Sequence, residues 1–185
     1  MLFRSFPDEL RLDLRLTAFE MTGAADSWDA VFGDPMIQGG IGLEWRPMRR
    51  LLLLATADYG SANGEQVLLT DPPTSTGIGV TFTYLPVHLG AAWIVNPDRR
   101  WRVALGGGPT FVSWDDDSGG GASGSDFGGH VLAQLRHAGD SFSWGAEARW
   151  STVPDAVGEG GVTRFFGEDD IGGIALTLFG GWRLR

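Results

Sequence analysis

The stretch LRLDLRL, residues 10–16, alternates leucine with charge along its whole length. Successive side chains of an extended strand point to opposite faces. The four leucines therefore share one face, and Arg11, Asp13 and Arg15 share the other. Alternation alone leaves open which face lies inside, because a water-soluble barrel and a membrane barrel use the same pattern in opposite orientations. The class of function depends on that choice.

The same period of two recurs along the chain, with Gly, Asp and Pro clusters between the runs. No segment has a convincing 3.6-residue period, so we expect little helix. The pattern predicts one all-β domain over residues 1–185. Its strands are expected at residues 9–22, 36–46, 51–61, 77–95, 101–114, 128–138, 142–153 and 171–185.

The predicted connections alternate in length along the chain. An up-and-down array of hairpins therefore collects the long connections at one end and the short ones, with both termini, at the other. The long loops are expected at residues 23–35, 61–75, 115–128 and 154–170, and the short turns at residues 46–50, 96–100 and 138–141.

The tryptophans favour an apolar face that points outward. Most of them lie close to the short turns, at one height on the apolar face, where they would crowd the end of a narrow barrel. On the outside the same indoles form an interfacial belt at the level of the lipid headgroups. We expect this belt at Trp45, Trp93, Trp101, Trp144 and Trp182, with Tyr59 and Trp150 beginning the opposite belt.

The polar face mixes glycine with charges of both signs, which suits the confined interior of an eight-stranded barrel. Pointing this face at lipid would cost about 2–4 kcal/mol for each mid-membrane Arg. We therefore predict an eight-stranded antiparallel up-and-down transmembrane β-barrel. Its lumen is expected to hold a paired polar network of Arg11, Asp13, Arg15, Gln38, Glu44, Asp58, His88, Arg102, His130, Gln134, Arg136, Glu147 and Arg149.

Some residues break the alternation. Leucines and aromatics fall on the expected lumen face at Leu52, Leu54, Phe82, Tyr84 and Leu132. Proline cannot donate a ladder hydrogen bond, so Pro86 and Pro109 are expected at bulges or at weak points of the sheet. A register shift is predicted near Pro86.

Composition excludes several classes of function. The formal net charge is −9 and no basic stripe is present, which argues against a nucleic-acid partner. Without cysteine, neither a disulfide framework nor a thiolate metal site is possible. We expect no cofactor.

Three segments resemble strands of the small eight-stranded outer-membrane β-barrels of Gram-negative bacteria, the group of OmpA-like and OmpX-like barrels. They are WRVALGGGPTFVSW (101–114), SWGAEARWSTV (143–153) and DIGGIALTLFGGWRLR (170–185). The resemblance implies an integral outer-membrane protein with long loops outside the cell and both termini in the periplasm. It also implies contact with outer-membrane lipids and lipopolysaccharide, and with the barrel-assembly machinery during insertion. The chain departs from the family in ending Leu184-Arg185, where an aromatic residue is usual.

The resemblance does not fix one activity. Charge is segregated, with acids in the long loops and arginines in the short turns, and acidic loops offer oxygen ligands for Ca²⁺ or Mg²⁺. The candidates for weak cation binding are Asp115, Asp116, Asp117, Glu168, Asp169 and Asp170.

We expect a non-enzymatic barrel that acts in surface interaction, adhesion or membrane anchoring, with a surface protein as a candidate partner. The alternatives are a narrow pore for small solutes, a lipid-modifying enzyme and a soluble lipocalin-like binder. Known lipid-modifying barrels use His and Ser, but no His-x-Ser pair is present, since the residues two after the histidines are Gly90, Leu132 and Gly139.

Overall fold

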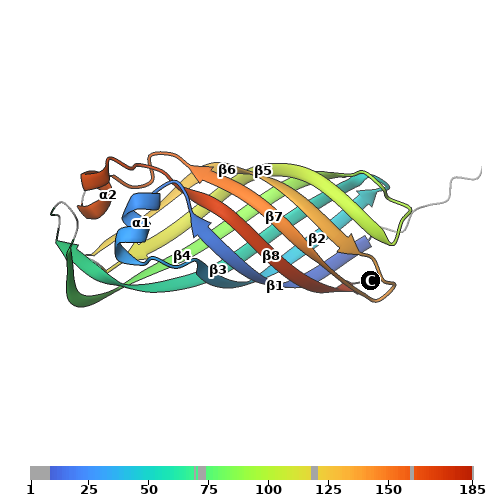
Figure 1. Cartoon of the computed structure of the whole chain (residues 1–185). Coiled ribbons are helices and arrows are strands. Elements are labelled where there is room, and N and C mark those ends of the chain that lie inside the picture. Colours follow the sequence, from blue (N-terminus) through green and yellow to red (C-terminus); the bar gives the residue numbers. More distant parts are fainter. Residues whose placement is uncertain (1–8, 69, 71–73, 118–120, 159–160, 185) are drawn as a thin grey trace, which may run out of the picture.

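Eight strands form one closed antiparallel barrel in the computed structural model, which describes residues 9–68, 70, 74–117, 121–158 and 161–184 (Figure 1). Two short helices interrupt the order of the strands, and neither is long and apolar enough to cross a membrane. The elements are β1 (Glu9–Met21), α1 (Ala25–Val31), β2 (Met36–Met48), β3 (Leu51–Leu68), β4 (Thr74–Ile94), β5 (Trp101–Asp116), β6 (Ala122–His137), β7 (Phe142–Val153), α2 (Gly161–Phe166) and β8 (Ile171–Leu184).

Each strand pairs with its neighbours in the chain, and β1 closes the ring by pairing with β8. The opening stretch lies in β1, between β2 and β8, with Leu12 opposite Leu43 on one side and Trp182 on the other. Both helices lie at one end of the barrel in Figure 1, and the short turns lie at the other end. The predicted up-and-down topology is confirmed.

The leucines of β1 face outward. Leu14 and Leu16 are 55% and 58% exposed, whereas Arg15 is 5% exposed and Asp13 is fully buried. The alternation continues along most of β1, and β7 shows the same pattern with the opposite phase. The face carrying the charges is therefore the inside of the barrel, as predicted.

Two of the predicted loops are wrong in extent. Most of the predicted loop 61–75 is strand, because β3 runs to Leu68 and β4 begins at Thr74. Likewise β5 runs to Asp116 and β6 begins at Ala122, so little of the predicted loop 115–128 is loop. These polar segments satisfy their backbone groups by pairing with each other as long hairpins. Such pairing does not require an apolar face.

The predicted loops 23–35 and 154–170 contain α1 and α2, respectively. The predicted turn 46–50 is shorter than expected, since β2 continues to Met48 through a register shift between Trp45 and Met48. The predicted register shift near Pro86 is wrong. The pairing of β4 with β5 keeps one register from Phe82 to Ile94.

Glycine allows the strands to approach closely inside the barrel. A Cβ atom at Gly106 would overlap the carbonyl oxygen of Ala91, and one at Gly145 would overlap the carbonyl oxygen of Leu135. The outward Gly39, by contrast, has nothing within 4 Å of the same position. A side chain at Gly106 or Gly145 would therefore require the neighbouring strand to move.

Candidate functional site

The barrel lumen collects the residues that sequence analysis assigned to it. All of them are buried, at 5% exposure or less, except Arg102, whose side chain is 21% exposed. They do not form one continuous network. Ion pairs fill the half of the lumen nearer the short turns. Toward the helices, the next layer contains the two histidines, and the last layer contains aromatic side chains.

One charged group is centred on Arg136 in β6. Its guanidinium donates to Asp13 Oδ2 at 2.7 Å, to Glu44 Oε1 at 2.5 Å and to Ser143 Oγ at 2.5 Å. Gln134 Nε2 also donates to Glu44 Oε1, at 2.7 Å. This cluster ties β6 to β1, β2 and β7 across the lumen.

A second group pairs two arginines with two carboxylates. Arg15 Nη2 and Arg149 Nη2 both donate to Glu147 Oε1, at 2.8 and 2.6 Å. The same guanidiniums reach Asp58, from Arg15 Nε at 3.3 Å and from Arg149 Nη1 at 3.8 Å. Buried charges are tolerable only when paired in this way.

The two predicted lumen histidines share one hydroxyl. Thr110 Oγ1 lies 2.8 Å from His88 Nδ1 and 3.0 Å from His130 Nδ1. Because a hydroxyl has a single proton to donate, one ring nitrogen accepts from Thr110 and the other donates to it. Thr110 thus bonds the Nδ1 atom of both rings. Among the described residues, no cluster of three or more His, Asp or Glu side chains is placed to hold a metal ion.

An apolar cap lies across the lumen at the helix end. Trp28 of α1 is 5% exposed and makes an edge contact with Phe82, which in turn stacks on Tyr84. Phe82 and Tyr84 break the alternation as apolar residues on the lumen face. Their packing in this cap explains why they point inward. Sequence analysis missed the contribution of α1. The buried residues of the cap are Phe19, Met21, Ala24, Trp28, Met36, Phe82, Tyr84, Val112, Val153 and Ile171.

Leu52, Leu54 and Leu132, the other apolar residues on the lumen face, form a second buried cluster with Ala92, Ile94 and Ala104. This cluster lines one side of the lumen, and Leu52, Ile94 and Ala104 reach the mouth at the short turns.

At the mouth itself lies a carboxylate that sequence analysis did not assign. Glu9 is 7% exposed and lies within 4 Å of four guanidinium groups. Of these arginines, Arg46 and Arg183 were also missed, although strand alternation places both on the lumen side. The four are Arg11, Arg46, Arg102 and Arg183.

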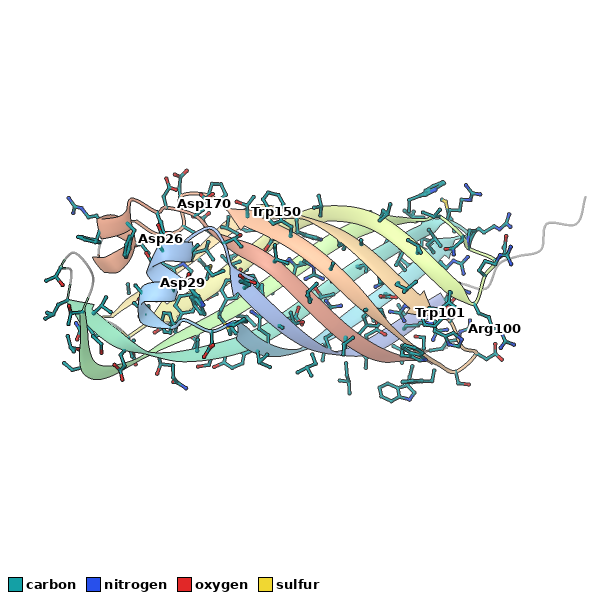
Figure 2. All side chains as sticks on the ribbon, viewed as in Figure 1. Asp26, Asp29, Arg100, Trp101, Trp150 and Asp170 are labelled. Carbon is teal, nitrogen blue, oxygen red and sulfur yellow. The ribbon has the colours of Figure 1, made fainter. Side chains whose placement is uncertain are left out.

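All the predicted belt aromatics lie on the outer surface. Their exposed fractions range from 42% for Trp101 to 57% for Tyr59. Figure 2 shows Trp101 beside the short turns and Trp150 well toward the helix end. Trp101 contacts Trp144 edge-on, with ring centroids 5.1 Å apart, so the two indoles form one patch.

Charge is segregated between the two ends, with Asp26, Asp29 and Asp170 at the helix end and Arg100 at the turns (Figure 2). The turns are tied together by an ion pair between Arg49 and Asp98. The hydrogen bond from Arg49 holds the pKa of Asp98 below its ordinary value.

Some of the acidic side chains that the sequence offered as cation ligands accept hydrogen bonds from nearby groups of the chain. Asp117 Oδ1 accepts from the Thr81 backbone N–H at 2.5 Å, and Asp170 Oδ2 accepts from Thr152 Oγ1 at 3.4 Å. Glu168 accepts from the backbone N–H groups of Asp26 and Ser27, at 2.8 and 3.0 Å. These carboxylates satisfy local donors, and Glu168 holds the first turn of α1 in place. Among the residues that the structure describes, no three of these carboxylates lie close enough together to hold a metal ion.

No protein-family model matches the chain, and no curated protein matches its sequence significantly. Solved structures do resemble it. Neisserial surface protein A (NspA) superimposes with a TM-score of 0.60 at 11% sequence identity, over 96% of this chain and 97% of NspA.

Two other solved structures show the same likeness. The attachment invasion locus protein Ail of Yersinia pestis gives a TM-score of 0.54 at 13% identity, over 96% of this chain and 97% of Ail. The N-terminal β-barrel domain of Pseudomonas aeruginosa OprF gives 0.54 at 11% identity, over 95% and 97%. At these identities the likeness concerns the fold. The chain has the fold of the small eight-stranded outer-membrane β-barrels.

Proposed function

We propose that the protein is an integral outer-membrane barrel with a closed lumen, and that its helix end acts in surface interaction, adhesion or anchoring. The observation that carries this proposal is the inversion of polarity. Large apolar side chains cover the outside while charged groups pair within. A soluble lipocalin-like binder requires the opposite arrangement.

Refolding with a heat-modifiability gel tests this proposal. We expect the unfolded chain to give a compact band that shifts on heating only after transfer into detergent or phospholipid vesicles. Refolding to the same compact state in buffer alone contradicts the membrane assignment and favours the soluble alternative.

The filled lumen supports anchoring over conduction. Two layers of ion pairs and the aromatic cap lie in series along the barrel. We therefore expect the protein to show no steady open level in a planar bilayer. A reproducible open level, altered by Arg136→Met, favours the alternative of a narrow pore.

The histidines support a non-enzymatic role. His88 and His130 are each 5% exposed and bonded to Thr110, so neither ring is presented to a lipid. We expect no acyl transfer or hydrolysis on lipid A or phospholipid. Activity that is lost in His88→Ala or His130→Ala contradicts this expectation.

The acidic helix end favours a cationic partner. Ail, one of the similar barrels, has been solved in complex with the heparin analogue sucrose octasulfate, which is a polyanion. In this chain the helix end instead carries exposed carboxylates at Asp26, Asp29 and Asp169. We expect vesicles bearing the refolded protein to bind polylysine in a salt-sensitive way, and heparin not at all.

We also propose that the helix end faces outside the cell and the short turns face the periplasm. The chain has no cysteine, so single-cysteine variants report orientation cleanly. In intact cells a membrane-impermeant maleimide is expected to label Asp29→Cys and not Arg100→Cys. The reverse labelling pattern contradicts the orientation.

A further inference from the structure

Two neighbouring short turns carry more positive than negative charge. One joins β2 to β3 and the other joins β4 to β5, and their arginines are Arg49, Arg50, Arg99 and Arg100. Asp98 is the one carboxylate in these two turns, and it pairs with Arg49. The third short turn, between β6 and β7, contains no arginine. Positive charge is therefore concentrated on the β2–β5 side of this end of the barrel.

Three of these arginines have no carboxylate partner. Among the residues that the structure describes, no Asp or Glu side chain forms an ion pair with Arg50, Arg99 or Arg100. All three side chains are exposed. Water alone can satisfy an exposed guanidinium group, so what these arginines bind depends on where they lie relative to the membrane.

Two of the three adjoin the indole belt. Arg50 Cζ lies 5.7 Å from the centroid of the Trp93 ring, so its charge is held against the outer wall of the barrel. Arg100 directly precedes Trp101, and Figure 2 shows both residues at the short turns. Trp93 and Trp101 are 55% and 42% exposed on the outer surface. Because belt indoles lie at the level of the lipid headgroups, these two guanidinium groups lie where lipid phosphates lie.

The backbone that presents these arginines is held in place. Asn96 Nδ2 donates to the Trp101 carbonyl at 2.7 Å, and Asn96 Oδ1 accepts from the Val103 N–H at 2.6 Å. The ion pair of Arg49 with Asp98 joins this turn to the neighbouring one. A ligand that binds here orders little additional chain, which lowers the entropic cost of binding.

We propose that Arg50 and Arg100, together with the rings of Trp93 and Trp101, bind the headgroup of an anionic phospholipid. We call these four residues the headgroup site. Guanidinium groups match phosphate oxygens in geometry and charge, and indole rings pack well at the boundary between headgroup and acyl chain. The net positive charge of the two turns favours a lipid with a net negative charge over a zwitterionic one. The site depends on the membrane position of the barrel, and not on the role or orientation of the helix end.

The test uses protein labelled with fluorotryptophan and refolded in dodecyl maltoside, a detergent without charge or phosphate. Phosphatidylglycerol is added at increasing mole fraction and constant ionic strength, and fluorine NMR follows the indoles. The variants Trp93→Phe, Trp101→Phe and Trp150→Phe assign three of the signals. We expect saturable shifts for Trp93 and Trp101, while Trp150, well toward the helix end, reports general changes of the micelle.

Two other ligands separate the features of the headgroup. Phosphatidylcholine has the same phosphate and acyl chains without a net charge, and we expect it to need a mole fraction about tenfold higher or more for half-saturation. Inorganic phosphate carries the negative charge without the lipid, and we expect it to produce no saturable shift of Trp93 or Trp101.

Matched variants test the arginines. Arg50→Gln and Arg100→Gln are each expected to raise the mole fraction of phosphatidylglycerol at half-saturation about fivefold, since each removes one positive charge at the headgroup level. Arg164→Gln makes the same change of charge at an exposed arginine of α2, at the opposite end, and should leave the midpoint unchanged. The heat-shifted band confirms separately that each variant has folded and inserted.

Three results overturn the proposal in protein that shows the heat-shifted band. Equal midpoints for phosphatidylglycerol and phosphatidylcholine mean that the belt does not select for charge. Saturation by inorganic phosphate at Trp93 and Trp101 identifies a site for free anions. Equal midpoints for Arg50→Gln, Arg100→Gln and Arg164→Gln mean that the overall charge of the protein, and not the headgroup site, attracts the lipid.

Discussion

Arg136 shows what a single side chain does in this lumen. It pairs with two carboxylates, Asp13 and Glu44, in a space where Asp13 is fully buried and Glu44 is 3% exposed. We expect Arg136→Met to lower the free energy of unfolding by about 3–5 kcal/mol, because it leaves two buried acids unpaired. Urea unfolding in phospholipid vesicles, followed by tryptophan fluorescence, measures this change.

The matched control for Arg136→Met is Arg99→Gln, an exposed arginine of a short turn, expected to change stability by no more than about 0.5 kcal/mol. Adding Asp13→Asn and Glu44→Gln to Arg136→Met should recover most of the loss, since no unpaired charge then remains. A loss as large in the triple variant as in Arg136→Met contradicts the electrostatic explanation.

The Arg49–Asp98 pair predicts a pH effect at one turn. Because the pKa of Asp98 is lowered in the folded protein, its contribution to stability is present above the ordinary value of 3.8 and is lost as the pH falls through the folded pKa. Arg49→Gln is expected to raise the pKa of Asp98 toward 3.8. An NMR titration of the Asp98 carboxyl carbon measures it, and an unchanged midpoint contradicts the role of Arg49.

Single residues were predictable where alternation is unbroken. Arg15, Glu147 and Arg149 lie in the middle of regular strands, and period two placed each of them inside. Arg46 was assigned to a turn because the strand was expected to end there, while β2 continues through an irregularity. The ion-pair partners themselves depend on register and rotamer, which the sequence does not state.

Among the elements, α1 depends on a residue far from it in sequence. Glu168 accepts from two backbone N–H groups of its first turn and from the Ser27 hydroxyl. We expect Glu168→Ala to release α1, with amide hydrogen exchange at Asp26 and Ser27 faster by about tenfold or more. Asp169→Ala, an exposed neighbour, is the control and should leave this exchange unchanged.

The same variant also tests the lumen cap. Since Trp28 of α1 covers Phe82, its release exposes the indole to quenchers added in water. Rapid exchange in Glu168→Ala without any change at Trp28 contradicts the view that α1 closes the lumen as one unit.

Elements were predictable only where one face is apolar. The outer parts of β3–β6 carry mostly polar or small residues with no regular apolar face, so their sequence matches a loop as well as a strand. The seven residues of α1 are too few to establish a helical period. Pairing between neighbouring hairpins and packing on the lumen decide these segments, and neither is a property of the local sequence.

For the whole molecule, stability depends on whether the outer surface of the barrel contacts lipid or water. Leu14 lies near the middle of β1 and is 55% exposed. In phospholipid vesicles we expect Leu14→Arg to destabilise the barrel by about 2–4 kcal/mol, and Leu184→Arg, at the end of β8, by about 1 kcal/mol or less. Reversible urea unfolding measures both, and equal effects of the two variants contradict a transmembrane position for β1.

The pairing of β1 with β8 has a consequence for biogenesis. β1 finds its second neighbour only after β8 has been synthesised, so no shorter part of the barrel is a complete ring. Until then, β1 and the last strand formed are edge strands with unpaired backbone N–H and C=O groups. Such edges can pair with other chains and lead to aggregation. A cell that makes this protein must shield it from synthesis to closure, and deleting residues 171–185 should leave a product that aggregates and is degraded instead of a smaller barrel.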